Sequence, residues 1–386
     1  MSALNQLLAP YNVDDFLQNF WTQKSLFISG QGDRRFDRFF SWEKLNNLLN
    51  YHELDTAMRL AVDGKVLDPK ENPDFLQHCQ QGATLIIDRV HKLIPELASF
   101  VSQLRSQIGH PIQINLYCSW PGKQGFRCHY DTHDVFILQI DGSKEWNVFT
   151  DTLKYPLKTD KSSQLQPPAE SPYLNCVLEP GDVLYIPRGH WHYALALDRP
   201  SLHLTLGIHG KTGIDVLEWI VEEFKKKEQW RQTLPLLSPQ SPVSGDRHIE
   251  TLARDLTEYL STEEVGDRYI RHLQTAYKPI GGIALPQQAG FDIFIQGVNT
   301  RFTQSIERSI EICELETGLG YQVTVGHQEI LLRGVSKSFI EKLLGTANFT
   351  GTDVINWLPD YDWEIDIVPL LARLVKENIL FVDRQL

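Results

Sequence analysis

Residues 111–209 carry the most regular pattern of apolar and polar positions in the chain. Residues 112–117 alternate between apolar and polar side chains, as expected for a strand with one buried face. Residues 135–140 are nearly all apolar, which predicts a strand buried on both faces. Further strands are predicted over residues 145–149, 183–186, 193–197 and 202–209. Many short strands separated by turn residues indicate a sandwich or barrel, and an eight-stranded jelly roll fits this pattern.

Two details of this region bear on where side chains point. Asp141-Gly142 separates the strands over 135–140 and 145–149, and Asp-Gly is a strong signal for a tight hairpin turn. We therefore expect these two strands to form a hairpin, with Lys144 just beyond the turn. In the strand over 202–209, the leucines and Ile208 share one face, whereas His203, Thr205 and His209 share the other.

Helical periodicity dominates on both sides of this region. In the first 95 or so residues it is mixed with two short strands. The predicted N-terminal elements are helices over 14–22, 40–49 and 94–108 and strands over 26–28 and 85–87. After the strand-rich region, amphipathic helices are predicted over 214–227 and 249–260. The C-terminal module combines helices over 339–344, 352–358 and 367–376 with strands over 330–332 and 379–382, which suggests a winged-helix shape.

These patterns predict a mainly β protein with α additions, divided into three parts. Residues 1–210 form a β domain with an N-terminal α/β cap, and its barrel core covers about 111–210. Residues 211–280 form a helical region that is a candidate for homodimerisation. Residues 281–386 form the winged-helix-like domain.

Composition narrows the function classes. The formal net charge is −12, whereas a general nucleic-acid binder carries a basic face, so nucleic acid is an unfavoured partner. The winged-helix-like module has five Lys/Arg against eight Asp/Glu from Ser336 onward, a net charge of −3, which favours packing or partner binding over DNA binding. An acidic protein suits a basic substrate segment, although solubility alone explains the charge equally well.

Membrane and secretory signals are not visible. No apolar run reaches the ~18 residues of a membrane-spanning helix, and no basic segment followed by an apolar stretch marks a secretory signal at the N-terminus. The five cysteines are odd in number and scattered, which favours reduced thiols over a disulfide framework. We therefore expect a cytoplasmic protein that does not interact with membranes.

Two short motifs carry the candidate chemistry. Gly181, Pro187, Gly189 and His192 match the second cupin motif, G-x5-P-x-G-x-x-H, in which the histidine enters the barrel. His129, Asp131 and Gly142 keep the spacing of the first cupin motif, but Asp131 replaces its second histidine and Val135 its glutamate.

The four-ligand cupin site is thus reduced to two histidines and one carboxylate: His129, Asp131 and His192. Such a site leaves about three positions open on an octahedral metal, as non-haem Fe(II) oxygenases require for a co-substrate and O2. His190, two residues before His192, would share its strand face and competes for the role, as does His133. Spacing from Gly189 favours His192.

Lys144 is the candidate partner for a co-substrate carboxylate. 2-Oxoglutarate has a distal carboxylate that needs a cation inside the barrel. Lys144 lies on the strand after the Asp141-Gly142 turn, from which it could reach inward. The alternative is an ordinary solvated lysine at a turn.

The runs 115–117, 125–131 and 135–146 together resemble the JmjC-type ribosomal oxygenases, also called the cupin-4 group. The N-terminal entry segment and the C-terminal module are similar too. The resemblance implies a double-stranded β-helix, a helical dimerisation region and a C-terminal winged helix. It also implies Fe(II)- and 2-oxoglutarate-dependent hydroxylation of protein side chains, arginine and histidine among them, with O2 as oxidant.

Carried over by position, the resemblance implies roles for individual residues. His129, Asp131 and His192 would bind the metal, and Lys144 would pair with the distal carboxylate of 2-oxoglutarate. Asn115 would lie near the co-substrate, and Tyr117 would line the substrate channel. His203 and Thr205 fall in the H-x-T strand of the family. One departure is Gly207, which stands where the family has a serine that contacts the co-substrate.

Three functions are therefore compared. The first is a hydroxylase acting on a protein or peptide, such as a ribosomal protein or a ribosomally made precursor peptide. The second is a JmjC-type N-methyl-lysine demethylase using the same iron centre. The third is a non-catalytic cupin binding or regulatory protein. The complete triad together with Lys144 favours the first.

Overall fold

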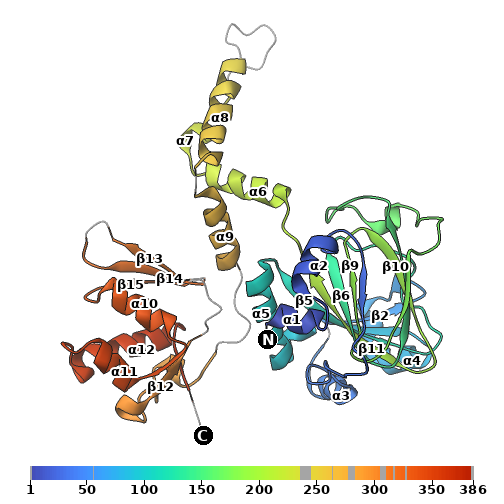
Figure 1. The fold of residues 1–386 in the computed structure, drawn as a ribbon, viewed down its shortest axis with the longest axis horizontal. Coiled ribbons are helices and arrows are strands. Elements are labelled where there is room, and N and C mark those ends of the chain that lie inside the picture. Colours follow the sequence, from blue (N-terminus) through green and yellow to red (C-terminus); the bar gives the residue numbers. More distant parts are fainter. Residues whose placement is uncertain are drawn as a thin grey trace. The chain divides into compact units, whose positions relative to one another are not determined.

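The chain of 386 residues is described here by a computed structural model. It describes residues 2–54, 56–234, 245–262, 264–276, 283–304, 310–315, 318–326 and 328–383. The chain divides into two compact units, residues 1–210 and 211–386 (Figure 1). Each unit is described separately.

The first unit is built on a large antiparallel sheet with the strand order β1-β9-β6-β11-β5-β4-β2-β3. Its central strands are among those predicted above, and β11 pairs with β5 on one side and β6 on the other. The strands are β1 (Leu26–Ile28), β2 (Met58–Val62), β3 (Lys65–Val66), β4 (Thr84–Ile87), β5 (Ile112–Ser119), β6 (Asp134–Asp141), β9 (Val183–Ile186) and β11 (Ser201–Ile208).

A second sheet of three strands, in the order β10-β7-β8, faces part of the large one. It contains β7 (Lys144–Asp151), β8 (Leu174–Leu178) and β10 (His190–Ala196). Buried side chains from both sheets form one apolar cluster: Val135, Ile137, Trp146, Val148, Leu178, Leu184 and Ile186. This two-sheet arrangement is the predicted jelly-roll core.

The hairpin predicted at Asp141-Gly142 is wrong. β6 pairs with β9 and β11 in the large sheet, whereas β7 pairs with β8 and β10 in the small one. The chain therefore crosses from one sheet to the other at this turn. Gly142 has a φ of +68°, and a Cβ there would lie 2.1 Å from the carbonyl oxygen of Pro200, so only glycine fits the crossing. The crossing carries Lys144 to the start of a strand that faces the barrel interior.

The N-terminal cap covers the barrel with helices that the periodicity mostly predicts. The predicted helices correspond to α2 (Val13–Asn19), α3 (Trp42–Tyr51) and α5 (Pro95–Ile108), whereas α1 (Ala3–Leu8), α4 (Phe75–Gln80) and the hairpin β2–β3 were not predicted. Phe16 of α2 is fully buried, and its ring lies 4.9 Å from that of Tyr185 on β9. This aromatic contact attaches the cap to the barrel.

The second unit begins with helices. They are α6 (Gly213–Phe224), α7 (Glu228–Arg231), α8 (Gly245–Leu260) and α9 (Val265–Ala276). Trp219, Ile220 and Phe224 of α6 are buried against side chains of α8 and α9. On another face of α6, Ile214, Leu217 and Val221 remain about half exposed.

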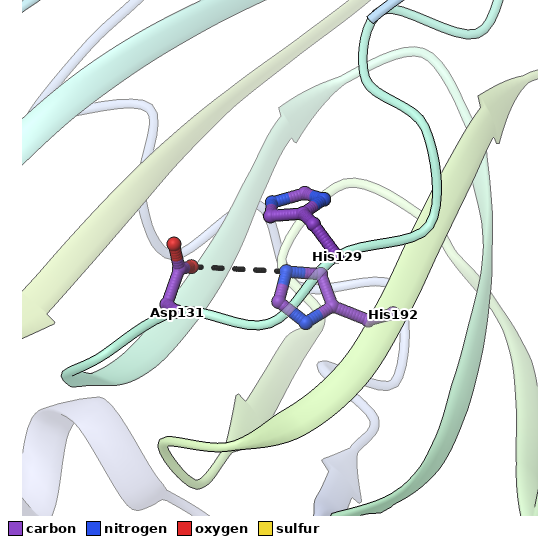
Figure 2. A group of neighbouring side chains, drawn as sticks. All are labelled: His129, Asp131 and His192. Carbon is purple, nitrogen blue, oxygen red and sulfur yellow. Dashed lines mark ion pairs between the residues drawn. The ribbon is translucent and has the colours of Figure 1, made fainter. Parts of the chain in front are cut away.

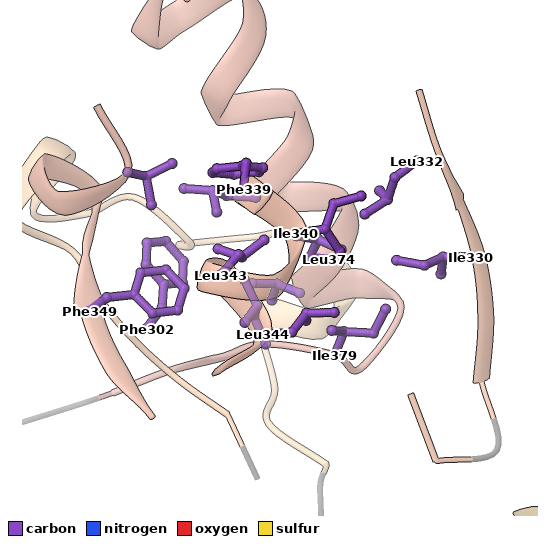
Figure 3. Close-up of a cluster of buried hydrophobic side chains, with 14 of the residues drawn as sticks. Phe302, Ile330, Leu332, Phe339, Ile340, Leu343, Leu344, Phe349, Leu374 and Ile379 are labelled. Atoms are coloured by element: carbon purple, nitrogen blue, oxygen red, sulfur yellow. The ribbon is translucent and has the colours of Figure 1, made fainter. Parts of the chain in front are cut away.

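The C-terminal module has its own apolar core (Figure 3). Phe302, Phe339, Leu343, Phe349 and Leu374 are buried in it. Its helices are α10 (Lys337–Gly345), α11 (Gly351–Trp357) and α12 (Val368–Lys376). They accompany the sheet β16-β12-β17, made of Asn348–Thr350, Arg301–Thr303 and Phe381–Val382, and the sheet β13-β14-β15, made of Ile310–Glu314, Tyr321–Val325 and Gln328–Leu332. Three helices with small sheets give the predicted winged-helix-like module.

Among the described residues, none of the helices combines the length and the apolar character needed to span a membrane.

Candidate metal centre

His129 and His192 lie side by side because their backbones pair. The N–H of His129 donates to the carbonyl of His192 at 3.1 Å, and the N–H of His192 donates to the carbonyl of His129 at 2.7 Å. The centroids of the two rings are 4.5 Å apart. This bridge connects β10 with the segment that precedes β6, so two motifs about sixty residues apart in the sequence lie side by side.

Asp131 completes the group (Figure 2). Its Oδ2 lies 3.7 Å from Nε2 of His192, and its carbonyl accepts a hydrogen bond of 2.9 Å from the N–H of Gly189. One donor atom from each of the three residues lies within 4.8 Å of the other two. The three residues predicted from motif spacing are therefore brought together at one site.

Both imidazoles are oriented by main-chain carbonyls. Nδ1 of His129 lies 2.8 Å from the carbonyl oxygen of Arg127, and Nδ1 of His192 lies 3.0 Å from that of His190. A carbonyl only accepts, so each Nδ1 carries the proton and each Nε2 keeps a free lone pair. This is the tautomer that a metal-binding histidine uses when its second nitrogen is held by the protein.

The charges suit a divalent metal. Burial, followed by the neighbouring His129, lowers the pKa of His192 to about 4, so its ring is neutral at neutral pH. Burial acts to raise the pKa of Asp131, but the surrounding imidazoles, His133 foremost, hold it below its usual value. Two imidazoles and one carboxylate are the ligand set of non-haem Fe(II) sites with open positions.

His190 does not share this site. β10 starts at His190 rather than at Tyr193, and its pairing with β7 shifts register between His190 and His192. The extra residue lies in β7, whose Asp151 and Val148 oppose His190 and His192. His190 instead forms a 2.8 Å hydrogen bond through Nδ1 with the hydroxyl of Tyr173, which also bonds to Ser25. Its role is structural.

A cavity of about 590 Å³ adjoins the centre. Its size is that of a pocket for a small molecule. Each residue named from the sequence for a site role lines it: His129, Asp131, His192, Lys144, Asn115, Tyr117, His203 and Thr205.

Lys144 is a buried cation in this cavity. It is 5% exposed, and its Nζ donates to the hydroxyl of Ser119 at 2.9 Å. No ion pair to it is present among the residues that the structure describes. Burial lowers the pKa of Lys144 to about 8. A buried ammonium without an anionic partner is costly unless a ligand supplies the negative charge, so the interpretation as a solvated turn lysine is wrong.

His203 and Tyr117 form a stacked pair beside Lys144. Their rings are nearly parallel, with centroids 5.1 Å apart. Burial holds the pKa of His203 well below its usual value, and burial followed by the Asp131 charge raises the pKa of Tyr117 to about 12. Within the described part of the chain, Nδ1 of His203 is buried and has no hydrogen-bond partner. A bound ligand could satisfy this nitrogen.

Asn115 has a structural contact as well as a place in the cavity. Its Oδ1 accepts a 2.9 Å hydrogen bond from the N–H of Arg89, a residue in the left-handed conformation with a φ of +53°. The side-chain oxygen therefore holds the turn after β4, and the Asn115 side chain also hydrogen-bonds to Tyr117. Thr205 lies next to Asn115 in the pairing of β11 with β5.

Several cavity residues were missed. Gln113 and Ser119 belong to the same alternating face of β5 as Asn115 and Tyr117, so the alternation could have identified them. Arg59 and Asp88 also line the cavity and form two hydrogen bonds of 2.6 Å, but they come from β2 and the end of β4. No sequence spacing connects these two segments with the motifs.

Comparisons with known proteins match the region of the chain that contains this site. The model of the JmjC domain family matches residues 90–216, which contain all eight residues named above. Ribosomal oxygenase 1 of Rattus norvegicus is 32% identical over 270 residues, covering 67% of this chain and 43% of the relative. The bifunctional lysine-specific demethylase and histidyl-hydroxylase NO66 of Dictyostelium discoideum is 28% identical over 315 residues, covering 75% of this chain and 58% of the relative. The chain thus spans about three fifths or less of the length of these relatives.

Solved structures agree in fold. YcfD, a ribosomal oxygenase from Escherichia coli determined in complex with cobalt and 2-oxoglutarate, matches with a TM-score of 0.61 at 19% identity. The match covers 97% of this chain and 99% of that one. The cupin-type β core with helical and winged-helix-like additions is therefore the fold of this protein. Residues 90–216 therefore match the JmjC domain family, and the chain is similar to the ribosomal oxygenases.

Proposed function

We propose that this protein is an Fe(II)- and 2-oxoglutarate-dependent oxygenase that hydroxylates an amino-acid side chain, arginine or histidine, of a protein or peptide. The observation that carries the proposal is a cluster of three candidate metal ligands and a buried lysine in one cavity. The relatives named as ribosomal oxygenases support a ribosomal protein as substrate, and a ribosomally made precursor peptide is the other candidate.

The residues fit both groups. His129, Asp131 and His192 would hold Fe(II) from one side only, because no fourth His, Cys, Asp or Glu joins their cluster among the described residues. Lys144 would hold the distal carboxylate of 2-oxoglutarate, whose charge matches the ammonium that the cavity buries. Asn115, His203 and Thr205 would contact the co-substrate, and Tyr117 would line the path of the substrate.

The bound iron and co-substrate supply oxidative decarboxylation to succinate and CO2, which activates O2 for attack on a C–H bond. The protein itself would orient the metal ligands and the co-substrate and would exclude water from the cavity. The carbonyls of Arg127 and His190 aim the two imidazoles, and the buried Lys144 sets the direction of the co-substrate. Trp146, which is 7% exposed, covers the space between Lys144 and His192 with its indole ring.

Succinate release tests the proposal. The protein, incubated with Fe(II), 2-oxoglutarate, O2 and a ribosomal protein extract, is expected to form succinate and to add the mass of one oxygen atom to one extract protein. His129→Ala is expected to abolish both results, because one of three metal ligands is lost. A protein that binds iron but forms no succinate with ribosomal or peptide substrates would favour the non-catalytic alternative.

A second candidate uses the same centre. The NO66 relatives are named as lysine-specific demethylases as well as histidyl-hydroxylases. Hydroxylation of an N-methyl group on lysine would release formaldehyde, whereas side-chain hydroxylation retains the added oxygen. The mass of the product therefore separates the two activities.

The proposal extends to a homodimer formed by the helical region. Ile214, Leu217 and Val221 lie on one face of α6 and are 50%, 52% and 53% exposed, an apolar stripe suited to a second copy of the chain. Light scattering is expected to give the mass of a dimer, and Leu217→Glu is expected to give a monomer. Leu76→Glu is the control, since Leu76 is equally apolar and exposed but lies on α4. A wild-type protein that is monomeric at micromolar concentration would contradict this part.

The five cysteines are free thiols, which supports a reducing compartment such as the cytoplasm.

A further inference from the structure

Two aromatic side chains lie behind the metal centre. Tyr130 separates His129 from Asp131 in the sequence, and Trp191 directly precedes His192. Neighbouring side chains of an extended segment point to opposite faces, so the two aromatic rings point away from the cavity that the three ligands line. The rings are 3% and 1% exposed and meet edge to face, with centroids 5.0 Å apart. The segments that carry the ligands on one face therefore carry a buried aromatic pair on the other.

The loop that follows β7, residues 152–160, binds both aromatic side chains. The hydroxyl of Tyr130 donates to the carbonyl oxygen of Asp160 at 3.1 Å. The Nε1–H of Trp191 donates to Oγ1 of Thr152 at 2.9 Å. The two ends of one loop are thus bonded to a residue adjacent to each histidine ligand.

The same loop reaches the carboxylate ligand through Gly189. The N–H of Gly189 donates to the carbonyl of Asp131 at 2.9 Å. Gly189 has a φ of +87°, and a Cβ there would lie 2.8 Å from the carbonyl oxygen of Leu153 and 3.0 Å from Cδ of Pro156. Only glycine allows the loop to approach the hydrogen-bond partner of Asp131 this closely. The 152–160 loop therefore contacts the segments of all three ligands.

The outer side of the loop is exposed. Leu153, Tyr155 and Leu157 are 38%, 51% and 44% exposed. Lys154 and Lys158 are exposed as well. Since these side chains bury little surface, the stability of the loop depends on its contacts with the ligand segments.

We propose that the 152–160 loop positions the metal ligands from behind, with Tyr130 and Trp191 as positioning residues. The inference rests on the metal binding that the proposed function requires. Local carbonyls orient each imidazole and a backbone bridge pairs the two histidines, whereas Asp131 lies beyond the bridge and is held through the loop. Release of the loop then weakens metal binding, and by thermodynamic linkage bound metal opposes that release by the same factor.

Titration with Co(II), followed by absorption, tests the effect of the loop on the metal. Tyr130→Phe keeps the ring but loses the bond to Asp160, and Thr152→Val removes the acceptor of Trp191. Each variant is expected to weaken Co(II) binding about tenfold, the lower end of the effect of losing a group that supports a metal ligand. The double variant is also expected to lose about tenfold, rather than roughly 100-fold, because both changes release the same loop.

Tyr185→Phe is the matched control. Tyr185 is fully buried and its hydroxyl donates to Asp134 at 2.8 Å, but its ring packs against Phe16 of the cap. This variant is expected to lower the thermal unfolding temperature at least as much as Tyr130→Phe does, while its Co(II) affinity stays within about threefold of the wild type. An equal loss of Co(II) affinity in Tyr185→Phe would indicate general destabilisation and overturn the positioning role.

Limited trypsin digestion tests the effect of the metal on the loop, since Lys154 and Lys158 place two cleavage sites in it. Saturating Co(II) is expected to slow cleavage at both sites about tenfold, the factor that linkage requires. Cleavage after Lys24, an exposed lysine of the cap, is expected to change by less than about twofold. Without metal, Tyr130→Phe is expected to be cleaved faster than the wild type at Lys154. Equal protection of Lys24 by Co(II) would overturn the coupling.

The outcomes distinguish the two proposals. Wild-type Co(II) affinity in both Tyr130→Phe and Thr152→Val would overturn the positioning role and leave the proposed function intact. A loss of roughly 100-fold in the double variant would overturn the action through one loop. No Co(II) binding by the wild type would overturn the metal centre on which the proposed function depends.

Discussion

Replacing His192 with alanine is expected to lower the affinity for Fe(II), or for Co(II) as its stand-in, by at least about 100-fold. Loss of residues that only support a metal ligand already costs 10- to 100-fold, and His192 is one of three ligands in the described centre. Titration with Co(II), followed by absorption, measures the effect. Asp131→Asn, which keeps the volume of the side chain, is expected to show a comparable loss.

His190→Gln is the matched control for this experiment. His190 lies two residues away and is equally buried, but its ring bonds to Tyr173 outside the cavity. Co(II) affinity is therefore expected to remain within about threefold, while the thermal unfolding temperature falls by a few degrees. Retained Co(II) binding in His192→Ala, with binding lost in His190→Gln, would reverse the assignment.

Replacing Lys144 with methionine is expected to weaken 2-oxoglutarate binding about 100-fold. Methionine fills nearly the same volume without the charge. Burying the co-substrate carboxylate without its charged partner costs several kcal/mol of binding free energy, and each step of about 1.4 kcal/mol lowers the affinity tenfold. Calorimetry on the Co(II)-loaded protein measures the change. Lys158→Met, at an exposed lysine, is expected to bind as the wild type does. Equal affinities in Lys144→Met and wild type would contradict the role of Lys144.

The same lysine predicts the pH dependence. The pKa of Lys144 is lowered to about 8 by burial, and a bound carboxylate favours the protonated form. Affinity for 2-oxoglutarate is therefore expected to be constant below pH 8 and to fall as pH rises above it, by up to tenfold per unit. Calorimetry at pH 7 and 9 measures this, and Lys144→Met is expected to lose the dependence. A wild-type affinity that rises between these values would contradict the assignment.

The metal centre could be predicted from the sequence because its spacing is local. His129 and Asp131 are two residues apart, and His192 follows a glycine–proline turn at a fixed distance, so each motif specifies its own ligand geometry. The meeting of the two motifs depends on strand pairing, which the jelly-roll pattern predicts. Whether these residues bind iron remains a prediction.

The crossing at Asp141-Gly142 could not be predicted, because a tight turn has the same local sequence whether or not the strands on either side pair. Which partner a strand chooses depends on contacts distant in sequence, here β11 for β6 and β10 for β7. The register shift between β7 and β10 has a similar origin. Strict alternation made His190 a competitor of His192, whereas the His190 ring bonds to Tyr173 and does not line the cavity.

Arg59 and Asp88 show the limit of motif reasoning for the rest of the cavity. They are contributed by the cap, and only the fold brings them beside Tyr117. The short strands β12, β13, β14 and β16 were missed for a related reason, because runs of three to five residues carry too little periodicity to distinguish strand from loop.

The carbonyls that hold Nδ1 of His129 and Nδ1 of His192 each belong to the residue two positions earlier in the chain. The orientation of the two imidazole rings is therefore set by the neighbouring backbone and requires no other side chain. Binding a metal should then freeze few additional rotamers, so little conformational entropy opposes it. Evolution can vary the residues around the cavity, and with them the substrate, without misaligning the iron ligands.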